Sequence, residues 1–158
     1  VDLIAHNLVD VYKGTGSKES WEKITLASTI GGMVINTAGV TLAHGMEHPA
    51  SGLKDIVHGK GLAALTPTII EASYQGAPEK FAKLAKLFGG EKAEDLAGKV
   101  RELLEAIELT CTLSDLGIEE KDIPWMAENC MKVSAPSIAN NPVVFSQEEI
   151  AEIYKKAL

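Results

Sequence analysis

The sequence predicts an all-α, helical bundle-like domain. Aromatic residues make up only 5% of the 158 residues and there are only 6 prolines, whereas good helix formers (Ala, Leu, Ile, Glu and Lys) dominate. Apolar residues recur at three-to-four spacing through most of the chain, and no alternating run is long enough to predict a sheet. The length suffices for one domain with a real core, and we find no repeat or linker that would divide it.

The first helix is expected over residues 1–12. Ile4, Leu8 and Val11 share one face of this helix, which ends at the turn-forming Gly14–Ser17 segment. The chain starts without Met, and it starts inside a helix with no capping residue ahead of it. We therefore expect the chain to be a fragment of a longer protein.

The second helix is expected over Lys18–Ile35. Gly31 and Gly32 inside it each cost about 1 kcal/mol relative to alanine. This glycine pair indicates either a close approach of another helix or a break into two helices, and both alternatives stay open. The residues expected in the core are Trp21, Ile24, Leu26, Ile30 and Val34.

Further helices are expected through the rest of the chain. Pro49 must end or kink the first of them, and Pro67 must interrupt or bend the second. Ser146 and Glu149 form a capping box ahead of the last helix. The expected helices cover Val40–Ser51, His58–Tyr74, Pro78–Phe88, Lys92–Ile107, a segment capped by Asp122 with Pro124 near its first turn, and Gln147–Ala157.

Three of the four histidines lie within Thr41–Leu62. His44 and His48 are four residues apart, so on a helix their β-carbons lie on one face, roughly 5–6 Å apart. A turn after this helix can bring His58 back towards them. Of the carboxylates nearby, Glu47 and Asp55 are expected to face solvent.

The fourth histidine, His6, follows Asp2 by four residues, which again places both on one helical face. With His44 and His58 the pair makes a set of three nitrogens and one oxygen, which suits a first-row divalent cation. The alternative is that each histidine is an ordinary helix residue, because acid–base pairs at this spacing are common on helix surfaces.

These residues resemble two motifs of the iron-containing alcohol dehydrogenase family. VDLIAH (Val1–His6) is similar to the D-x-x-x-H pair that opens the family's metal-binding domain. AHGMEHPASGLKDIVHG (Ala43–Gly59) is similar to its later histidine-rich segment, and the C-terminal residues Asn140–Leu158 are similar to the family's last loop and helix. Val57, among other positions, departs from the commoner pattern, so the substrate subgroup stays open.

The resemblance implies the C-terminal domain of the dehydroquinate synthase-like fold over residues 1–158. It implies that a divalent metal, Fe²⁺ first and Zn²⁺ or Ni²⁺ as alternatives, is held by the following ligands: Asp2, His6, His44 and His58. His48 would stay outside the ligand shell and relay the proton of an alcohol substrate.

The resemblance also implies a small alcohol or aldehyde as substrate and NAD or NADP as the hydride carrier. In the family an N-terminal α/β domain binds this cofactor through a glycine-rich segment. No βαβ pattern and no such motif occurs in this sequence. We therefore expect the isolated chain to lack cofactor-binding residues and to be inactive without that domain.

Two other functions stay open from the sequence. His44, Glu47 and His48 read H-x-x-E-H, the inverted motif of a zinc peptidase in which Glu47 would be the general base. Such an enzyme leaves Asp2, His6 and His58 without a role. A non-catalytic helical interaction domain is the third hypothesis.

The bulk properties exclude several partners. With 15 basic and 22 acidic residues the net charge is −7, which argues against nucleic acid or an anionic membrane as partner. No apolar run approaches the about 20 residues that a membrane-spanning helix needs, and no secretory leader is visible. Cys111 and Cys130 are expected to be free thiols in a reducing cytoplasm. An open metal face predicts a homo-oligomer.

Overall fold

The computed structural model describes the whole chain, Val1–Leu158, and confirms the all-α prediction. It contains nine α-helices, two short 3₁₀ helices and no strand. The α-helices are α1 (Asp2–Tyr12), α2 (Lys18–Ala38), α3 (Leu42–Lys54), α4 (His58–Ser73), α5 (Pro78–Leu87), α6 (Asp95–Ala106), α7 (Ile123–Val133), α8 (Ala135–Ala139) and α9 (Gln147–Lys156), and the 3₁₀ helices are η1 (Tyr74–Gly76) and η2 (Glu120–Asp122).

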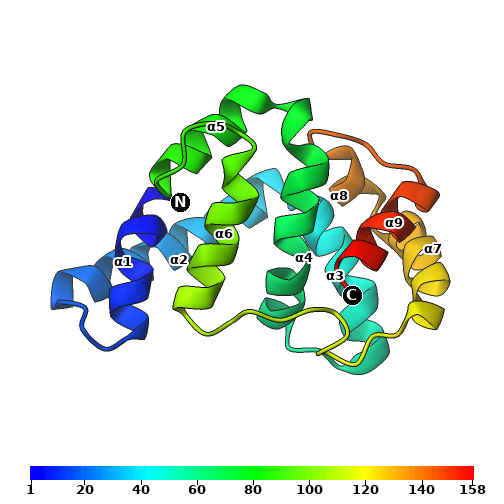
Figure 1. Ribbon diagram of the computed structural model, residues 1–158, viewed down its shortest axis with the longest axis horizontal. Helices are drawn as coiled ribbons and strands as arrows, with labels where there is room; N and C mark the ends of the chain where they lie inside the picture. Colours follow the sequence, from blue (N-terminus) through cyan, green and yellow to red (C-terminus); the bar gives the residue numbers. More distant parts are fainter.

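The helices form a bundle with α3 at its centre. α3 packs against α4, α7 and α8, while α9 packs against α7 and α4. α6 packs against both α4 and α5. α1 packs against α2 at the opposite end of the molecule from α7–α9 (Figure 1). The histidine-bearing helix α3 is therefore held from several sides.

The core is built from α3, α4, α7, α9 and the loop between α6 and α7. Tyr154 of α9 is fully buried, and its hydroxyl donates a hydrogen bond to the Met46 carbonyl of α3. Full burial of each large apolar side chain contributes about 1.5–3 kcal/mol. The largest fully buried apolar side chains are Leu42, Met46, Leu65, Leu113, Ile118, Ile123, Met126 and Ile150.

The core predicted for the second helix is wrong. Trp21 is 54% exposed, and Leu26, Ile30 and Val34 are also exposed. α2 packs mainly against α1, so most of its surface faces solvent. Both alternatives for Gly31 and its neighbour are wrong as well, because α2 runs through them unbroken and open space surrounds both positions.

α3 continues through Pro49 to Lys54, beyond the predicted end at Ser51. Pro49 has no N–H to donate to the carbonyl four residues earlier, that of Gly45. That carbonyl instead accepts a hydrogen bond from the Ser134 hydroxyl. The helix therefore passes its proline because another part of the fold supplies the missing donor.

The predicted helix boundaries differ in their outcome near the C-terminus. The capping box of α9 is confirmed, since the Ser146 hydroxyl accepts from the Glu149 N–H at 3.3 Å and the Glu149 carboxylate accepts from the Ser146 N–H at 2.8 Å. Asp122 precedes α7, but its side chain does not cap that helix. It accepts from the Glu119 N–H at 3.0 Å and so closes η2.

No single helix is long and apolar enough to cross a membrane. α2 and α3 pass that test only when they are taken together, and they meet at a bend of 97°. α3 is half of that pair, and it buries Leu42, Met46 and Ala50 in the core.

Candidate metal centre

Three imidazoles meet where α3 and α4 adjoin. His44 and His48 lie on α3, and His58 is the first residue of α4. The ring centroid of His58 lies 5.2 Å from that of His44 and 5.8 Å from that of His48, and the His44 and His48 centroids are 6.2 Å apart. The structure thus confirms that a turn brings His58 back to the α3 pair.

The turn that places His58 is built from the end of α3. Asp55 adopts the left-handed conformation (φ 53°), which aspartate tolerates better than most residues, and its N–H donates to the Ser51 carbonyl at 2.8 Å. The Ser51 hydroxyl also lies 3.0 Å from the Ile56 carbonyl. These contacts fold residues 55–57 back so that α4 starts beside α3.

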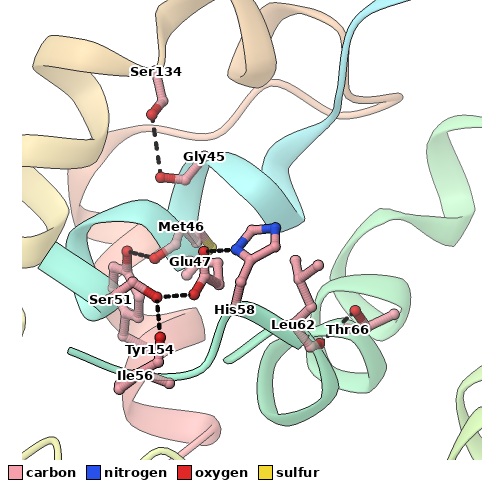
Figure 2. A network of polar contacts seen from close by, with 10 residues as sticks. All are labelled: Gly45, Met46, Glu47, Ser51, Ile56, His58, Leu62, Thr66, Ser134 and Tyr154. Carbon is pink, nitrogen blue, oxygen red and sulfur yellow. Dashed lines mark hydrogen bonds and ion pairs between the residues drawn. The ribbon is translucent and has the colours of Figure 1, made fainter. Parts of the chain in front are cut away.

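Glu47 is a functional candidate whose burial the sequence did not predict. Its side chain was expected to face solvent, but it is fully buried. Figure 2 shows one carboxylate oxygen against Nδ1 of His58 and the other against the Ser51 hydroxyl. Asp55 is exposed, as predicted. The available signal was the position of Glu47 on α3, directly beside the buried Met46 and one residue before His48.

The donor set fits a divalent metal ion. Glu47, His48 and His58 each offer one possible ligand atom, and these three atoms lie within 4.8 Å of one another. His44 adds a fourth donor beside His58. Imidazole nitrogens are ligands that zinc, iron and nickel accept in proteins, whereas the Glu47 carboxylate is already engaged by His58 and Ser51.

The electrostatics of the cluster favour a neutral His44. Burial lowers its pKa below the ordinary value of 6.5, and the neighbouring His58 and His48 lower it further, whereas Glu47 acts in the opposite direction. A neutral imidazole keeps a lone pair on one ring nitrogen, which is the form that binds a metal ion.

Asp2 and His6 are not brought to this cluster. Nδ1 of His6 lies 3.3 Å from the Asp2 carboxylate, and both side chains are mostly exposed, at 63% and 69% for His6 and Asp2. α1 packs on α2, away from the corner of α3 and α4 (Figure 1). The predicted set of four ligands is therefore not assembled in this structure, because helical spacing pairs the two residues without fixing where their helix lies.

The geometry does not favour the inverted peptidase motif. A general base must reach the proton of a water molecule bound beside it. Both oxygens of Glu47 are instead engaged by His58 and Ser51, and the carboxylate has no exposure.

Known proteins are similar to this chain in sequence and in fold. The model of the C-terminal region of the Fe-containing alcohol dehydrogenase family matches residues 1–158. A 1,3-propanediol dehydrogenase from Klebsiella pneumoniae is 32% identical over 165 aligned residues, which cover 99% of this chain and 42% of that protein.

Two solved structures of alcohol-oxidising enzymes are similar to this chain along almost its whole length. An archaeal halo-thermophilic alcohol dehydrogenase from a Red Sea brine pool superposes with a TM-score of 0.89 at 30% identity, covering 99% of this chain and 42% of that one. A 1,3-propanediol oxidoreductase superposes with a TM-score of 0.87 at 34% identity, covering 99% of this chain and 43% of that one. This chain thus spans less than half the length of these relatives. It belongs to the Fe-containing alcohol dehydrogenase family, whose C-terminal region it matches along its whole length.

Proposed function

We propose that this chain is the metal-binding part of an NAD(P)-dependent alcohol dehydrogenase that acts on a small alcohol or aldehyde. The observation that carries the proposal is the convergence of His44, His48 and His58 at one corner of a fold that matches the family along its whole length. The names of the similar proteins, a propanediol dehydrogenase and an alcohol dehydrogenase among them, support a small alcohol as the substrate class.

In this proposal His44 and His58 hold a divalent ion: iron, zinc or nickel. When bound, such an ion acts as a Lewis acid towards the oxygen of an alcohol or aldehyde. His44 contributes a neutral imidazole because burial lowers its pKa. His58 contributes the ring nitrogen that Glu47 does not contact. Asp2 and His6, paired on α1, are not used.

His48 has the position of a proton relay. It is exposed and lies on the same face of α3 as His44, and its ring stacks at 25° to the His58 ring. Imidazole can accept and release a proton near neutral pH. A side chain that touches both the metal corner and solvent can pass the substrate proton outwards.

The hydride carrier must be bound elsewhere. The redox chemistry of such an enzyme belongs to its nicotinamide cofactor, and the protein contributes position and electrostatics. This chain has no strand and therefore no βαβ unit that could bind a dinucleotide. The proposal therefore assigns NAD or NADP to the dinucleotide-binding part of a complete enzyme.

The setting of the proposal is a reducing cytoplasm and an oligomer of identical chains. Both cysteines are free, which supports a reducing compartment. Leu26, Ile30 and Met33 share one face of α2 and are exposed, which supports burial of this face against another surface. The net charge of −7 gives no support to nucleic-acid or anionic-membrane binding.

The test is metal analysis of the purified chain after chelation and reloading with Fe²⁺, Zn²⁺ or Ni²⁺. We expect about one ion per chain, since the cluster forms one site. A chain that retains no ion after dialysis, under conditions where it stays folded, would favour the non-catalytic interaction domain instead.

A further inference from the structure

We propose that Glu47 is a positioning residue of this site. It holds the His58 imidazole with the proton on Nδ1, so that Nε2 keeps its lone pair for the metal ion. The consequence for metal binding rests on the proposed function, whereas the protonation of the His58 ring can be measured without any metal.

The burial of Glu47 is the first argument. Its side chain has no exposure, and no lysine or arginine lies within ion-pair distance of it. A buried carboxylate without partners is strongly unfavourable, so such groups are found paired and hydrogen-bonded. The partners here are the His58 ring and the Ser51 hydroxyl, one for each oxygen (Figure 2).

The chemistry of the contact fixes the tautomer of His58. When a carboxylate oxygen accepts the hydrogen bond, the ring nitrogen that faces it is the donor and carries the proton. That nitrogen is Nδ1. In the neutral ring the proton then sits on Nδ1 and the lone pair on Nε2, which lies on the far side of the ring from Glu47 (Figure 2).

The same contacts argue that Glu47 is not itself a ligand. Both of its oxygens are engaged, and a metal ion bound to either one would have to displace His58 or Ser51. Gly61 of α4 closes the remaining side, because a β-carbon placed there would lie only 2.7 Å from Oε1 of Glu47. The carboxylate is thus enclosed behind the imidazole that it orients.

Such a carboxylate strengthens a metal site without touching the metal. It fixes the ring orientation and makes the opposite nitrogen a better donor, and loss of a partner of this kind typically weakens metal binding by about 10–100-fold. We expect a loss of this size when Glu47 can no longer accept the Nδ1 hydrogen bond.

The first experiment is heteronuclear NMR of the imidazole nitrogens in the metal-free chain. We expect the His58 proton on Nδ1 in the wild type and in Glu47→Gln, whose amide oxygen can still accept. In Glu47→Met, which keeps the volume and has no acceptor, we expect a mixture of both tautomers. Glu128→Gln, an exposed change on α7, is the control. A wild-type ring protonated mainly on Nε2, or the same tautomer in Glu47→Met, would overturn the proposal.

The second experiment measures Zn²⁺ and Co²⁺ affinity by competition with a chelating dye. We expect Glu47→Met to bind about 10–100-fold more weakly than the wild type, Glu47→Gln to be intermediate, and Glu128→Gln to be unchanged. If Glu47→Met fails to fold, wild-type affinity in Glu47→Gln contradicts the proposal.

Two further outcomes distinguish a positioning role of Glu47 from direct metal binding by Glu47, and from failure of the proposed function. If X-ray absorption on the zinc-loaded chain shows one ligand fewer in Glu47→Gln than in the wild type, Glu47 is a direct ligand and the positioning role is wrong. If the wild-type chain binds no metal, the proposed function fails, and the tautomer measurement still decides whether Glu47 orients His58.

Discussion

The hydroxyl of Ser134 donates a hydrogen bond of 3.2 Å to the main-chain carbonyl of Gly45. This is the carbonyl that Pro49 leaves without its helical donor. Ser134 is buried, and its β-carbon lies only 3.1 Å from the position that a Gly45 β-carbon would occupy. The close contact therefore favours glycine at position 45, and it fixes the helix that carries His44 and His48.

Ser134→Ala should lower the free energy of unfolding by about 1–3 kcal/mol, because the buried Gly45 carbonyl then has no donor. Urea unfolding followed by circular dichroism measures this change, and the slope with denaturant should stay the same. Ser137→Ala is the matched control, since no hydrogen bond of its hydroxyl is formed in the structure, and it should change stability by less than about 0.5 kcal/mol. Equal stability of both variants would contradict the role given to Ser134.

The low pKa of His44 predicts an acid-sensitive fold. Because burial lowers this pKa in the folded chain from 6.5, the unfolded chain binds more protons than the folded chain once the pH falls below about 6.5. The free energy of unfolding should therefore decrease as the pH falls through and below this value. Urea unfolding at a series of pH values from about 8 to about 5 measures the slope. His44→Gln should flatten it, whereas His6→Gln, at an exposed position, should not.

The two cysteines should differ in reactivity. Burial raises the pKa of Cys130 to about 12, and its side chain is fully buried. Burial also raises the pKa of Cys111, but this residue is partly exposed. Because the thiolate is the reactive form, a thiol reagent at about pH 8 should label Cys111 slowly and Cys130 only after unfolding. A folded Cys111→Ser variant that still reacts at the wild-type rate would be the contrary result.

The isolated chain should neither bind NAD(H) or NADP(H) nor oxidise alcohols at a useful rate. Hydride transfer needs the reacting atoms held roughly 3–3.5 Å apart, and an all-α chain has no dinucleotide-binding unit to do so. Titration calorimetry and an alcohol oxidation assay on the metal-loaded chain measure both. Cofactor binding in the micromolar range would show that these residues contain a cofactor site.

Local rules predicted the elements whose signals lie within one helix or turn. The capping box of Ser146 and Glu149 is a contact between residues three positions apart, so sequence alone defines it. The return of His58 was expected from Pro49 and Gly52, but both residues lie inside α3, and the turn is made by residues 55–57, where Asp55 adopts a positive φ.

The spacing of residues along a helix could not predict which other element packs against each face of that helix. The period of α2 correctly defines a helix, but its apolar residues are exposed because only α1 packs closely against it. Asp2 and His6 pair as predicted, yet α1 lies away from α3. Glu47 shows the opposite error. Its charge predicted a solvent-exposed side chain, but the side chain is buried, and hydrogen bonds with His58 and Ser51 compensate for its burial.

The central claim, that His44 and His58 hold a divalent ion, is tested most directly by the metal content of the chain and of its histidine variants after reloading and dialysis. The wild type and His6→Ala should retain about one ion per chain. His44→Ala and His58→Ala should each lose most of it, and His48→Ala should keep it, because His48 relays a proton and does not bind the ion. Full retention in both His44→Ala and His58→Ala would contradict the metal site, and loss in His48→Ala alone would exchange the roles of ligand and relay.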